Sequence, residues 1–243
     1  MSRKRGKLRI NRILWIGITL ISIFFIFKFF STLRPAFLFP KWKDYAVHGV
    51  DVSKYQGQID WYQLNNHEVK FAFIKATEGK ELVDKEFQNN WQQAKEVGII
   101  RGAYHFYRPN LDWKIQARNF ISQVELEKGD LPPVLDIELV HHRDQLNLLS
   151  DIRKWLEVVE RHYGVRPIVY TYENYYNRFL LNEFRHYNLW IAKYSHSSPC
   201  LDDDARWEFW QFSETGELKG VVNKIDLNCF YGTEAQLRKI LKK

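Results

Sequence analysis

The chain has 243 residues, of which 45% are hydrophobic and 16% aromatic, so it can bury a large core and does not have the composition of a disordered protein. Its formal net charge of +7 comes from seven Lys and Arg residues, without any Asp or Glu, among the first 30 positions. The remainder carries 29 basic residues against 29 acidic ones, which gives no reason to expect a nucleic-acid partner.

Residues 1–30 have the pattern of a cytoplasmic basic tail followed by a signal anchor. Residues 13–27 carry no charge, and the apolar stretch reaches residue 30 if Lys28 extends to the membrane interface. The stretch is short for a span of about 20 residues, so a cleaved secretion signal is the alternative. Residues 31–45 form a tether, and residues 46–243 form the folded domain. We therefore predict a single-pass protein of the cytoplasmic membrane, with its N-terminus in the cytoplasm and its domain outside.

The two cysteines, Cys200 and Cys229, both fall in the exported part, where oxidation is allowed. A disulfide between them would close a loop of about 30 residues and contribute about 3 kcal/mol in the chain-entropy model. Two buried thiols are the alternative.

Strand-like segments alternate with helical ones through the first part of the domain. The predicted strands span residues 47–53, 71–77, 99–106, 131–139 and 167–171. Four helices are predicted between these strands. The first begins after Asp60, the second runs from Asp84 to Gly98, the third spans 112–128, and the fourth ends near Gly164. This alternation predicts parallel strands joined by helical crossovers.

The rhythm changes after residue 171. Residues 188–192, 207–212 and 224–228 are strand-like with little helix between them, and a helix over 233–241 ends the chain. The pattern predicts an α/β protein that forms an irregular, TIM-like barrel, whose last three strands lack full crossovers. Because active sites of parallel barrels lie at the carboxyl ends of the strands, one mouth should gather Asp51, Tyr104, Asp136, Glu138 and Tyr170, with Asp226 as a further candidate.

The predicted strand over residues 131–139 carries two carboxylates on one face. Side chains alternate along a strand, so Asp136 and Glu138 point the same way with backbones about 6.5 Å apart. Each carboxylate then makes the other harder to ionise, and acid catalysis of glycoside cleavage needs such a pair, with one member protonated and one ionised. A solvated strand end or a structural ion pair is the alternative for an isolated Asp-x-Glu.

Several segments, in order, resemble the sequence blocks of glycoside hydrolase family 25 lysozymes. The resemblance covers residues 46–243, and its length and order make it specific although each block alone is weak. The blocks are GVDVS at 49–53, YQG at 55–57, IDW at 59–61, FAFIKATEG at 71–79, NW at 90–91, GAYHF at 102–106, LPPVLDIE at 131–138, LWIA at 189–192, FWQFS at 209–213 and IDLN at 225–228.

The resemblance implies a modified TIM-like barrel of five βα units plus three further strands. It also implies an N-acetylmuramidase that hydrolyses the β-1,4 bond between N-acetylmuramic acid and N-acetylglucosamine in peptidoglycan. By motif position Glu138 is the general acid/base and Asp136 orients the substrate's N-acetyl group, which attacks the anomeric carbon. Asp51 and Asp226 match the family's other two pocket acids, expected to hold the water and tune Glu138. The spacing of the pair leaves the retaining and inverting routes both open.

Aromatic and polar residues near the strand ends are candidates for substrate binding. For Lys75, pairing with a neighbouring acid is the alternative, and with nine Trp in the chain most must be packing groups. The substrate-binding candidates are Tyr104, Tyr170, Trp190, Gln211 and Lys75, with Trp210 as a further member of a sugar-stacking wall.

The resemblance implies no cofactor. A metal site of Asp136, Glu138 and His142 is disfavoured, because the adjacent His141 and His142 point apart on an extended chain. The expected partners are peptidoglycan glycan strands and, through the N-terminal helix, a membrane. Two other functions stay open: a non-catalytic module that binds peptidoglycan as a scaffold, and a hydrolase of another N-acetylated glycan such as chitin.

Overall fold

The computed structural model describes residues 44–138 and 145–243. The predicted basic tail, signal anchor and most of the tether lie outside these residues, as do His141 and His142. Within the described ranges, no helix has both the length and the apolar character needed to cross a membrane.

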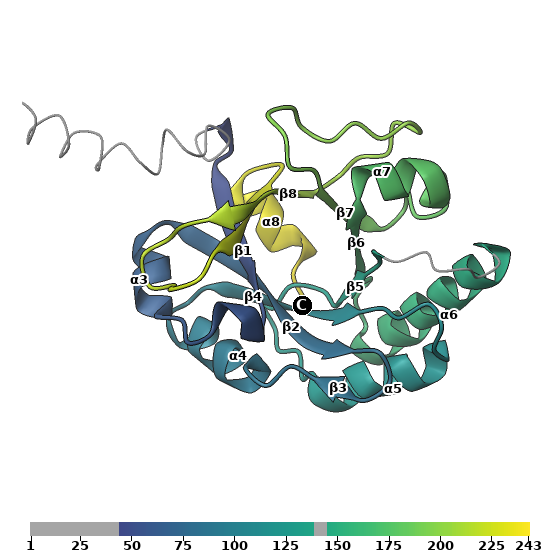
Figure 1. Cartoon of the computed structure of the whole chain (residues 1–243), viewed down its shortest axis with the longest axis horizontal. Coiled ribbons are helices and arrows are strands. Elements are labelled where there is room, and N and C mark those ends of the chain that lie inside the picture. Colours follow the sequence, from purple (N-terminus) through teal and green to yellow (C-terminus); the bar gives the residue numbers. More distant parts are fainter. Residues whose placement is uncertain (1–43, 139–144) are drawn as a thin grey trace, which may run out of the picture. The chain divides into compact units, whose positions relative to one another are not determined.

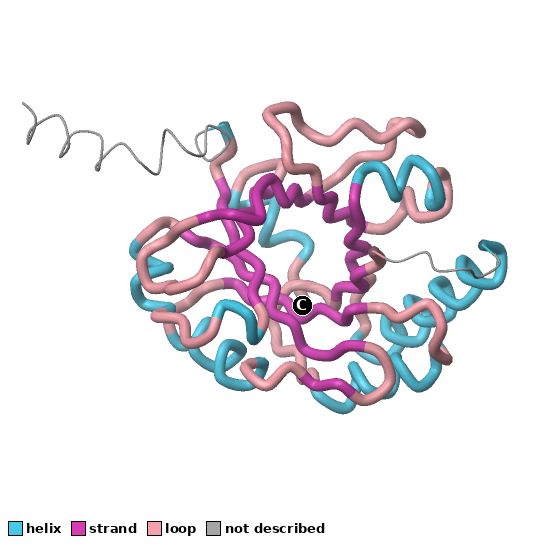
Figure 2. The backbone as a smooth tube through the Cα atoms, viewed as in Figure 1, coloured by secondary structure: helices cyan, strands magenta, loops and turns pink. Residues whose placement is uncertain are grey.

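Eight strands close into a barrel, and a ninth short strand extends one of them (Figures 1 and 2). Around the ring the order is β1-β2-β4-β5-β6-β7-β8-β9, and β9 pairs again with β1. Neighbours from β1 to β8 are parallel, whereas β9 runs antiparallel to both β8 and β1. The strands are β1 (Val47–Val52), β2 (Val69–Glu78), β3 (Leu82–Val83, antiparallel to the end of β2), β4 (Ile100–Phe106), β5 (Val134–Asp136), β6 (Ile168–Tyr172), β7 (Asn188–Ala192), β8 (Phe209–Gly216) and β9 (Ile225–Phe230). The predicted α/β barrel is confirmed.

Helices surround one side of this ring, while α8 lies within it in the view of Figure 2. Long helices fill the crossovers that precede β4, β5 and β6, and after β6 only short turns and loops connect the strands. The helices are α3 (Trp61–Asn66), α4 (Phe87–Glu96), α5 (Trp113–Gln123), α6 (Gln145–Tyr163), α7 (Glu173–Tyr175) and α8 (Glu234–Ile240), with a 3₁₀ turn η1 (Lys54–Gln56) and a π-helical turn η2 (Tyr176–Leu180). The change of rhythm after residue 171 is therefore confirmed.

The predicted element ends hold at some positions and fail at others. Asp60 caps α3, with its carboxylate accepting from the Gln63 amide at 3.1 Å. Asp84 was predicted to cap the next helix, but α4 begins at Phe87 without a side-chain cap. Asp84 is instead buried, and its carboxylate accepts from the backbone amides of Lys54 and Glu86. The sequence pattern missed this role because Lys54 is far away along the chain.

Two further boundaries are shorter than predicted. The helix expected over 112–128 ends at Gln123, because Val124 is already extended (φ −109°, ψ 119°). The strand expected over 131–139 pairs only over Val134–Asp136. Glu138 therefore follows the strand and does not lie within it.

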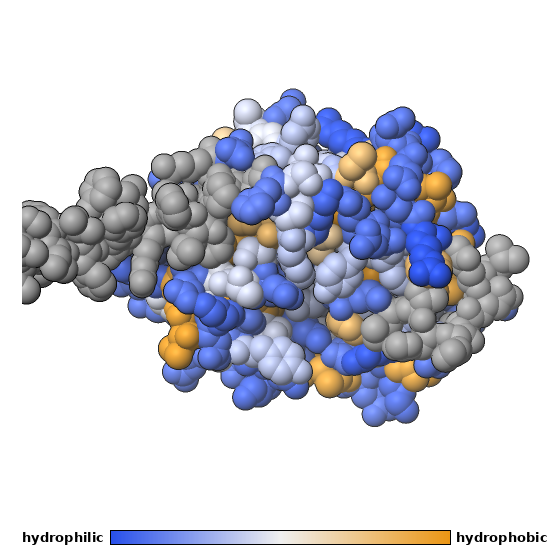
Figure 3. All heavy atoms as spheres, turned by 45° about the horizontal axis from the view of Figure 1, so that its top comes forward, coloured by the Kyte–Doolittle hydropathy of each residue, from blue (hydrophilic) through white to orange (hydrophobic). Residues whose placement is uncertain are grey.

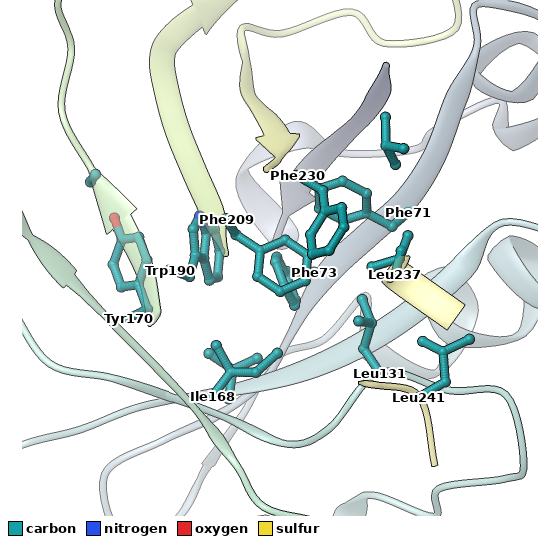
Figure 4. Close-up of a cluster of buried hydrophobic side chains, with 13 residues drawn as sticks. Phe71, Phe73, Leu131, Ile168, Tyr170, Trp190, Phe209, Phe230, Leu237 and Leu241 are labelled. Carbon is teal, nitrogen blue, oxygen red and sulfur yellow. The ribbon is translucent and has the colours of Figure 1, made fainter. Parts of the chain in front are cut away.

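Aromatic side chains fill the barrel interior below its mouth (Figure 4). The rings of Phe73 and Trp190 stack 4.1 Å apart, and Phe71 packs edge-on against Phe73. Glycines make the room: a Cβ on Gly49 would lie 2.4 Å from the Phe71 ring, and one on Gly102 would lie 2.9 Å from Phe73. A packed interior of this kind leaves space for a ligand only at an end of the barrel.

The candidate disulfide between Cys200 and Cys229 is not formed, although the structure describes both residues. Cys229 is buried in β9, where its neighbours include Tyr45 on the outside of the barrel. Cys200 is exposed in the loop after β7, and its amide donates to Glu173 of α7. The disulfide prediction is wrong because the two residues belong to different environments. The alternative of two buried thiols holds for Cys229 and fails for Cys200, which is exposed.

The described surface in Figure 3 is mostly hydrophilic, with hydrophobic residues scattered in small groups. Exposed large side chains are nevertheless present on the molecule, Tyr55 and Val222 among them. Such isolated residues are ordinary on a protein surface unless a neighbouring site gives them a role.

Candidate active site

All nine predicted catalytic and substrate-binding residues line one pocket of about 260 Å³ at the mouth of the barrel. They come from every one of the eight barrel strands or from the residues directly after them, although they span most of the folded domain in sequence. They are Asp51, Lys75, Tyr104, Asp136, Glu138, Tyr170, Trp190, Gln211 and Asp226. The structure thus brings together what the strand pattern predicted to meet.

Asp226 reaches this mouth by a different route from the others. It is the second residue of β9, whereas Asp51 and Asp136 lie at the ends of β1 and β5. Because β9 is antiparallel to β1, its beginning lies beside the end of β1, and Asp51 pairs in register with Asp226. The rule that sites lie at strand ends applies to parallel strands, so the reversed last strand gives Asp226 the same position from its start.

Two amide side chains hold the Asp51 carboxylate. Its Oδ2 accepts from Gln211 Nε2 at 2.8 Å and from Asn228 Nδ2 at 2.7 Å. Both amides are fixed in turn, since Asn228 Oδ1 accepts from Trp190 Nε1 at 2.8 Å and Gln211 Oε1 accepts from Tyr170 at 2.8 Å. Burial raises the pKa of Asp51 to about 6, and the hydrogen bonds from the amides oppose that rise.

Asp226 holds a proton where Asp51 does not. Burial and the neighbouring charge of Asp51 raise the pKa of Asp226 to about 9. A protonated Asp226 donates to the Asp51 carboxylate, and this hydrogen bond favours the charged form of Asp51. Near neutral pH the pair therefore carries one charge, located on Asp51.

Asp136 and Glu138 form the second acid pair of the pocket. Burial, followed by the charge of Glu138, raises the pKa of Asp136 well above its usual range. Burial also raises the pKa of Glu138, and the nearby Tyr170 hydroxyl, which can donate to Glu138 in place of Gln211, lowers it. Among the described residues Asp136 Oδ1 is buried and has no hydrogen-bond partner. Such an atom is typical of a site that a ligand completes.

Lys75 is the cation of this pocket. Its ammonium lies 2.7 Å from a carboxylate oxygen of Glu78, as the alternative for this residue predicted, and 4.8 Å from the centre of the Phe106 ring. Arg108 pairs with the same Glu78. The positive charge of Lys75 lowers the pKa of both Asp136 and Glu138, so it opposes the effect of burial.

The aromatic wall differs in part from the prediction. Tyr170 and Trp190 pack against each other with ring centres 4.3 Å apart, and burial raises the pKa of Tyr104 well above its usual range. Trp210 does not belong to the wall, because it alternates with Gln211 and faces out of the barrel, where its Nε1 donates to the Lys193 carbonyl at 2.9 Å. Neighbouring residues of a strand point to opposite faces, so Gln211 faces the pocket and Trp210 faces away from it.

Sequence reasoning missed several residues of the pocket. Tyr172 follows Tyr170 by two positions on β6 and Phe106 follows Tyr104 by two on β4, so strand parity gave a signal for both. Asn228 follows Asp226 by two positions on β9 and had the same signal, but only the closed barrel shows that it bridges Trp190 and Asp51. The missed pocket-lining residues are Ser53, Tyr55, Gln56, Phe106, Tyr172, Tyr194 and Glu214.

Five carboxylic acids line the pocket. In residues 44–138 and 145–243 no group of three or more His, Cys, Asp or Glu side chains has the arrangement of a metal site. The metal site weighed for Asp136, Glu138 and His142 lies partly outside the described residues. What the pocket does contain is two pairs of acids whose environments push their pKa values apart.

A barrel mouth with a protonated acid beside an ionised one, walled by aromatic rings, has the chemistry of a glycoside hydrolase. Residues 50–221 match the family model described as Glycosyl hydrolases family 25, and the chain belongs to this family. It is therefore a glycoside hydrolase.

The chain is also similar to individual proteins. The chain is 40% identical over 199 residues to the uncharacterized protein YegX of Escherichia coli K12. This alignment covers 80% of this chain and 73% of that protein. It is 36% identical over 206 residues to Lysozyme M1 of Streptomyces globisporus, covering 79% of this chain and 70% of the relative. A family 25 glycosyl hydrolase from Bacillus anthracis has a similar solved structure, with a TM-score of 0.76, 36% identity and coverage of 81% and 94% of the two chains.

Proposed function

We propose that this protein is a peptidoglycan muramidase that hydrolyses the β-1,4 bond between N-acetylmuramic acid and N-acetylglucosamine. One observation carries the proposal: an acid pair, the buried Asp136 and the partly buried Glu138, both with a raised pKa, lies in the mouth of a family 25 barrel. The similarity to Lysozyme M1 supports the choice of peptidoglycan as the substrate.

In this proposal Glu138 is the general acid/base and Asp136 assists the N-acetyl group. In the free pocket Asp136 has the more strongly raised pKa, so the proton of the pair rests there. A substrate acetamide N–H bonds more strongly to an ionised carboxylate than to a neutral acid, and Asp136 Oδ1 is buried without a partner among the described residues. Binding would therefore favour the Asp136 anion and leave the proton on Glu138, the member with the more accessible side chain.

The proton on Glu138 then passes to the glycosidic oxygen as the bond to the leaving sugar breaks. The acetamide, whose N–H donates to Asp136, attacks the anomeric carbon through its carbonyl oxygen, and the ionised Glu138 later takes a proton from the water that opens the intermediate. Asp51, held ionised by amide donors and by Asp226, adds negative charge that keeps the pKa of Glu138 raised. In this scheme Asp51 and Asp226 hold the water and tune the acid.

The test uses the full chain, native and Glu138→Gln, incubated with peptidoglycan, and identifies the sugar at each new reducing end. Native protein should release muramic acid ends, and Glu138→Gln should release them at least about a hundredfold more slowly while unfolding at the same temperature. Glu214→Gln is the matched control, because Glu214 lines the same pocket but has no role in the proposed reaction. Its rate should stay within a fewfold of native.

The other results each contradict a different part of the proposal. Near-native turnover by Glu138→Gln would remove Glu138 as the acid, and glucosamine ends would mean that the other bond is cut. Equal hydrolysis of chitin oligomers would indicate a hydrolase with wider selectivity for N-acetylated glycans. No release, with native and variant both sedimenting with the wall, would indicate a non-catalytic binding module.

We also propose that residues 13–30 hold the domain at the outer side of a cytoplasmic membrane, on the sequence pattern alone. The test expresses the full chain and a variant that lacks residues 1–33, then separates membrane and soluble fractions. The full chain should sediment with membranes and keep its first residues. A shortened, soluble mature chain would favour the cleaved signal instead.

A further inference from the structure

The catalytic pocket is too small to hold a glycan strand. Its volume of about 260 Å³ lies below the range of about 300–1,000 Å³ that pockets for drug-sized ligands have. A polymeric substrate must therefore pass over the rim, and the sugars outside the pocket need a surface of their own. Sugar rings have faces of C–H groups, which pack well on an exposed aromatic ring.

Tyr55 offers such a ring at the rim. Its side chain lines the pocket and is nevertheless 70% exposed. The Lys54 ammonium lies 5.3 Å from the centre of the ring. A large aromatic side chain that stays in solvent at the edge of a catalytic pocket loses little by packing against a ligand and gains contact area.

The backbone under Tyr55 is fixed from two sides. Asn223, from the hairpin between β8 and β9, donates to the Tyr55 carbonyl at 2.9 Å, and Gln56 donates to the Lys224 carbonyl in the same hairpin at 3.1 Å. On the other side the buried Asp84 accepts from the Lys54 amide at 3.1 Å. A ring carried on a fixed backbone costs less conformational entropy to bind than one on a free loop.

We propose that Tyr55 is a stacking platform at the rim of the catalytic pocket, for a sugar of the glycan strand beyond those at the cleaved bond. The proposal rests on the muramidase function above and adds a binding subsite to it. It also explains the position of Asp84, whose buried carboxylate holds η1 in place.

Tyr55 combines a free, exposed ring with a position at the pocket, and two other exposed tyrosines each lack one of these features. Tyr194 is 41% exposed and lines the pocket, but its hydroxyl donates to Gln211 at 3.0 Å, which ties it to the network around Asp51. Tyr62 is 67% exposed on α3 and does not line the pocket. Tyr62 is thus a matched control for exposure without the site.

The experiment measures kcat/KM of the full chain for long, soluble, uncross-linked glycan strands and for an aryl glycoside of the muramic acid disaccharide. Tyr55→Ala should lower kcat/KM on long strands about tenfold, which equals about 1.4 kcal/mol, mostly through KM. Tyr55→Phe should keep most of the native value, because stacking uses the ring. Tyr62→Ala should match native, and all variants should match native on the short substrate. Unfolding temperatures should be equal, because exposed side chains contribute little to stability.

The outcomes separate the subsite from the function. If Tyr55→Ala stays within twofold of native on long strands, or loses equally on the short substrate, the stacking subsite is refuted while the muramidase stands. If native protein cuts neither substrate, the proposed function itself fails. Asn223→Ala gives a second reading, because releasing the Tyr55 carbonyl should produce a smaller loss on long strands alone, and no loss would argue against the fixed platform.

Discussion

Replacing Asp226 by Asn should stabilise the protein at neutral pH while impairing its activity. Burial and the charge of Asp51 raise the pKa of Asp226 from 3.8 to about 9. The folded state therefore keeps a proton that the unfolded state releases, and each further pH unit in this interval disfavours folding. An Asn at this position still donates an N–H to Asp51 but carries no proton to hold.

The magnitude follows from that shift. One pKa unit corresponds to 1.36 kcal/mol, so between pH 3.8 and pH 7 the raised pKa of Asp226 destabilises the native fold by at most about 4 kcal/mol. Because Asp226 is only partly buried, solvent screening reduces this to about 2 kcal/mol. For a domain of this size the variant should melt roughly 4–8 °C above native at pH 7.

The assay is urea or thermal unfolding of native and Asp226→Asn from pH 4 to pH 9. The native protein should lose stability relative to the variant as pH rises above about 4, and the gap should widen up to about pH 9, where native Asp226 ionises. Asp202→Asn, at an exposed carboxylate outside the pocket, should give no widening gap. A gap that stays constant with pH, or a variant less stable than native at pH 8, would refute the reasoning.

Two further predictions test the pocket and the scaffold. The charge of Asp51 raises the pKa of Glu138, so Asp51→Asn should move the alkaline limb of the kcat profile to lower pH, and a limb that moves up would contradict this coupling. Away from the site, Asp130→Ala should cost about 3 kcal/mol in urea unfolding, because the buried Arg101 guanidinium loses its buried partner at 2.8 Å and keeps only the half-exposed Glu127 as a counter-charge. Lys95→Ala, at an exposed ion pair, should leave the unfolding curve unchanged, and equal effects of both would show that burial is not the cause.

Much of the fold was predictable because the relevant signals are local. Alternation placed Asp51 and Asp136 at the ends of strands on the inward face, and the helical periods between strands indicated parallel neighbours. A carboxylate at the end of such a strand can point only toward the mouth or away from the barrel. The position of these two acids therefore followed from a few residues on either side of each.

The remaining features depend on contacts between distant segments. The direction of β9 is set by the hairpin that joins it to β8, and only this reversal brings the beginning of β9, with Asp226, beside Asp51. Asp84 was interpreted as a helix cap because a cap needs only a nearby amide, whereas its carboxylate also accepts from the Lys54 amide, which lies 30 residues earlier. The barrel must be closed before either relation can be seen.

The pairing of β1 with β9, which closes the barrel, explains why the pocket reduces the stability of the fold and yet has a well-defined geometry. Pairing β1 with β9 forces Asp51 and Asp226 together, where burial opposes the charge on each. Two side-chain amides and the proton on Asp226 compensate the single remaining charge on Asp51. Trp190, packed in the barrel core, holds one of those amides, Asn228, by a hydrogen bond. The orientation of Asp51 is therefore coupled to the packing of the aromatic interior. A substitution that loosens the ring stack should disturb the acid network before it unfolds the barrel, since a small shift of Trp190 lengthens the hydrogen bonds above it.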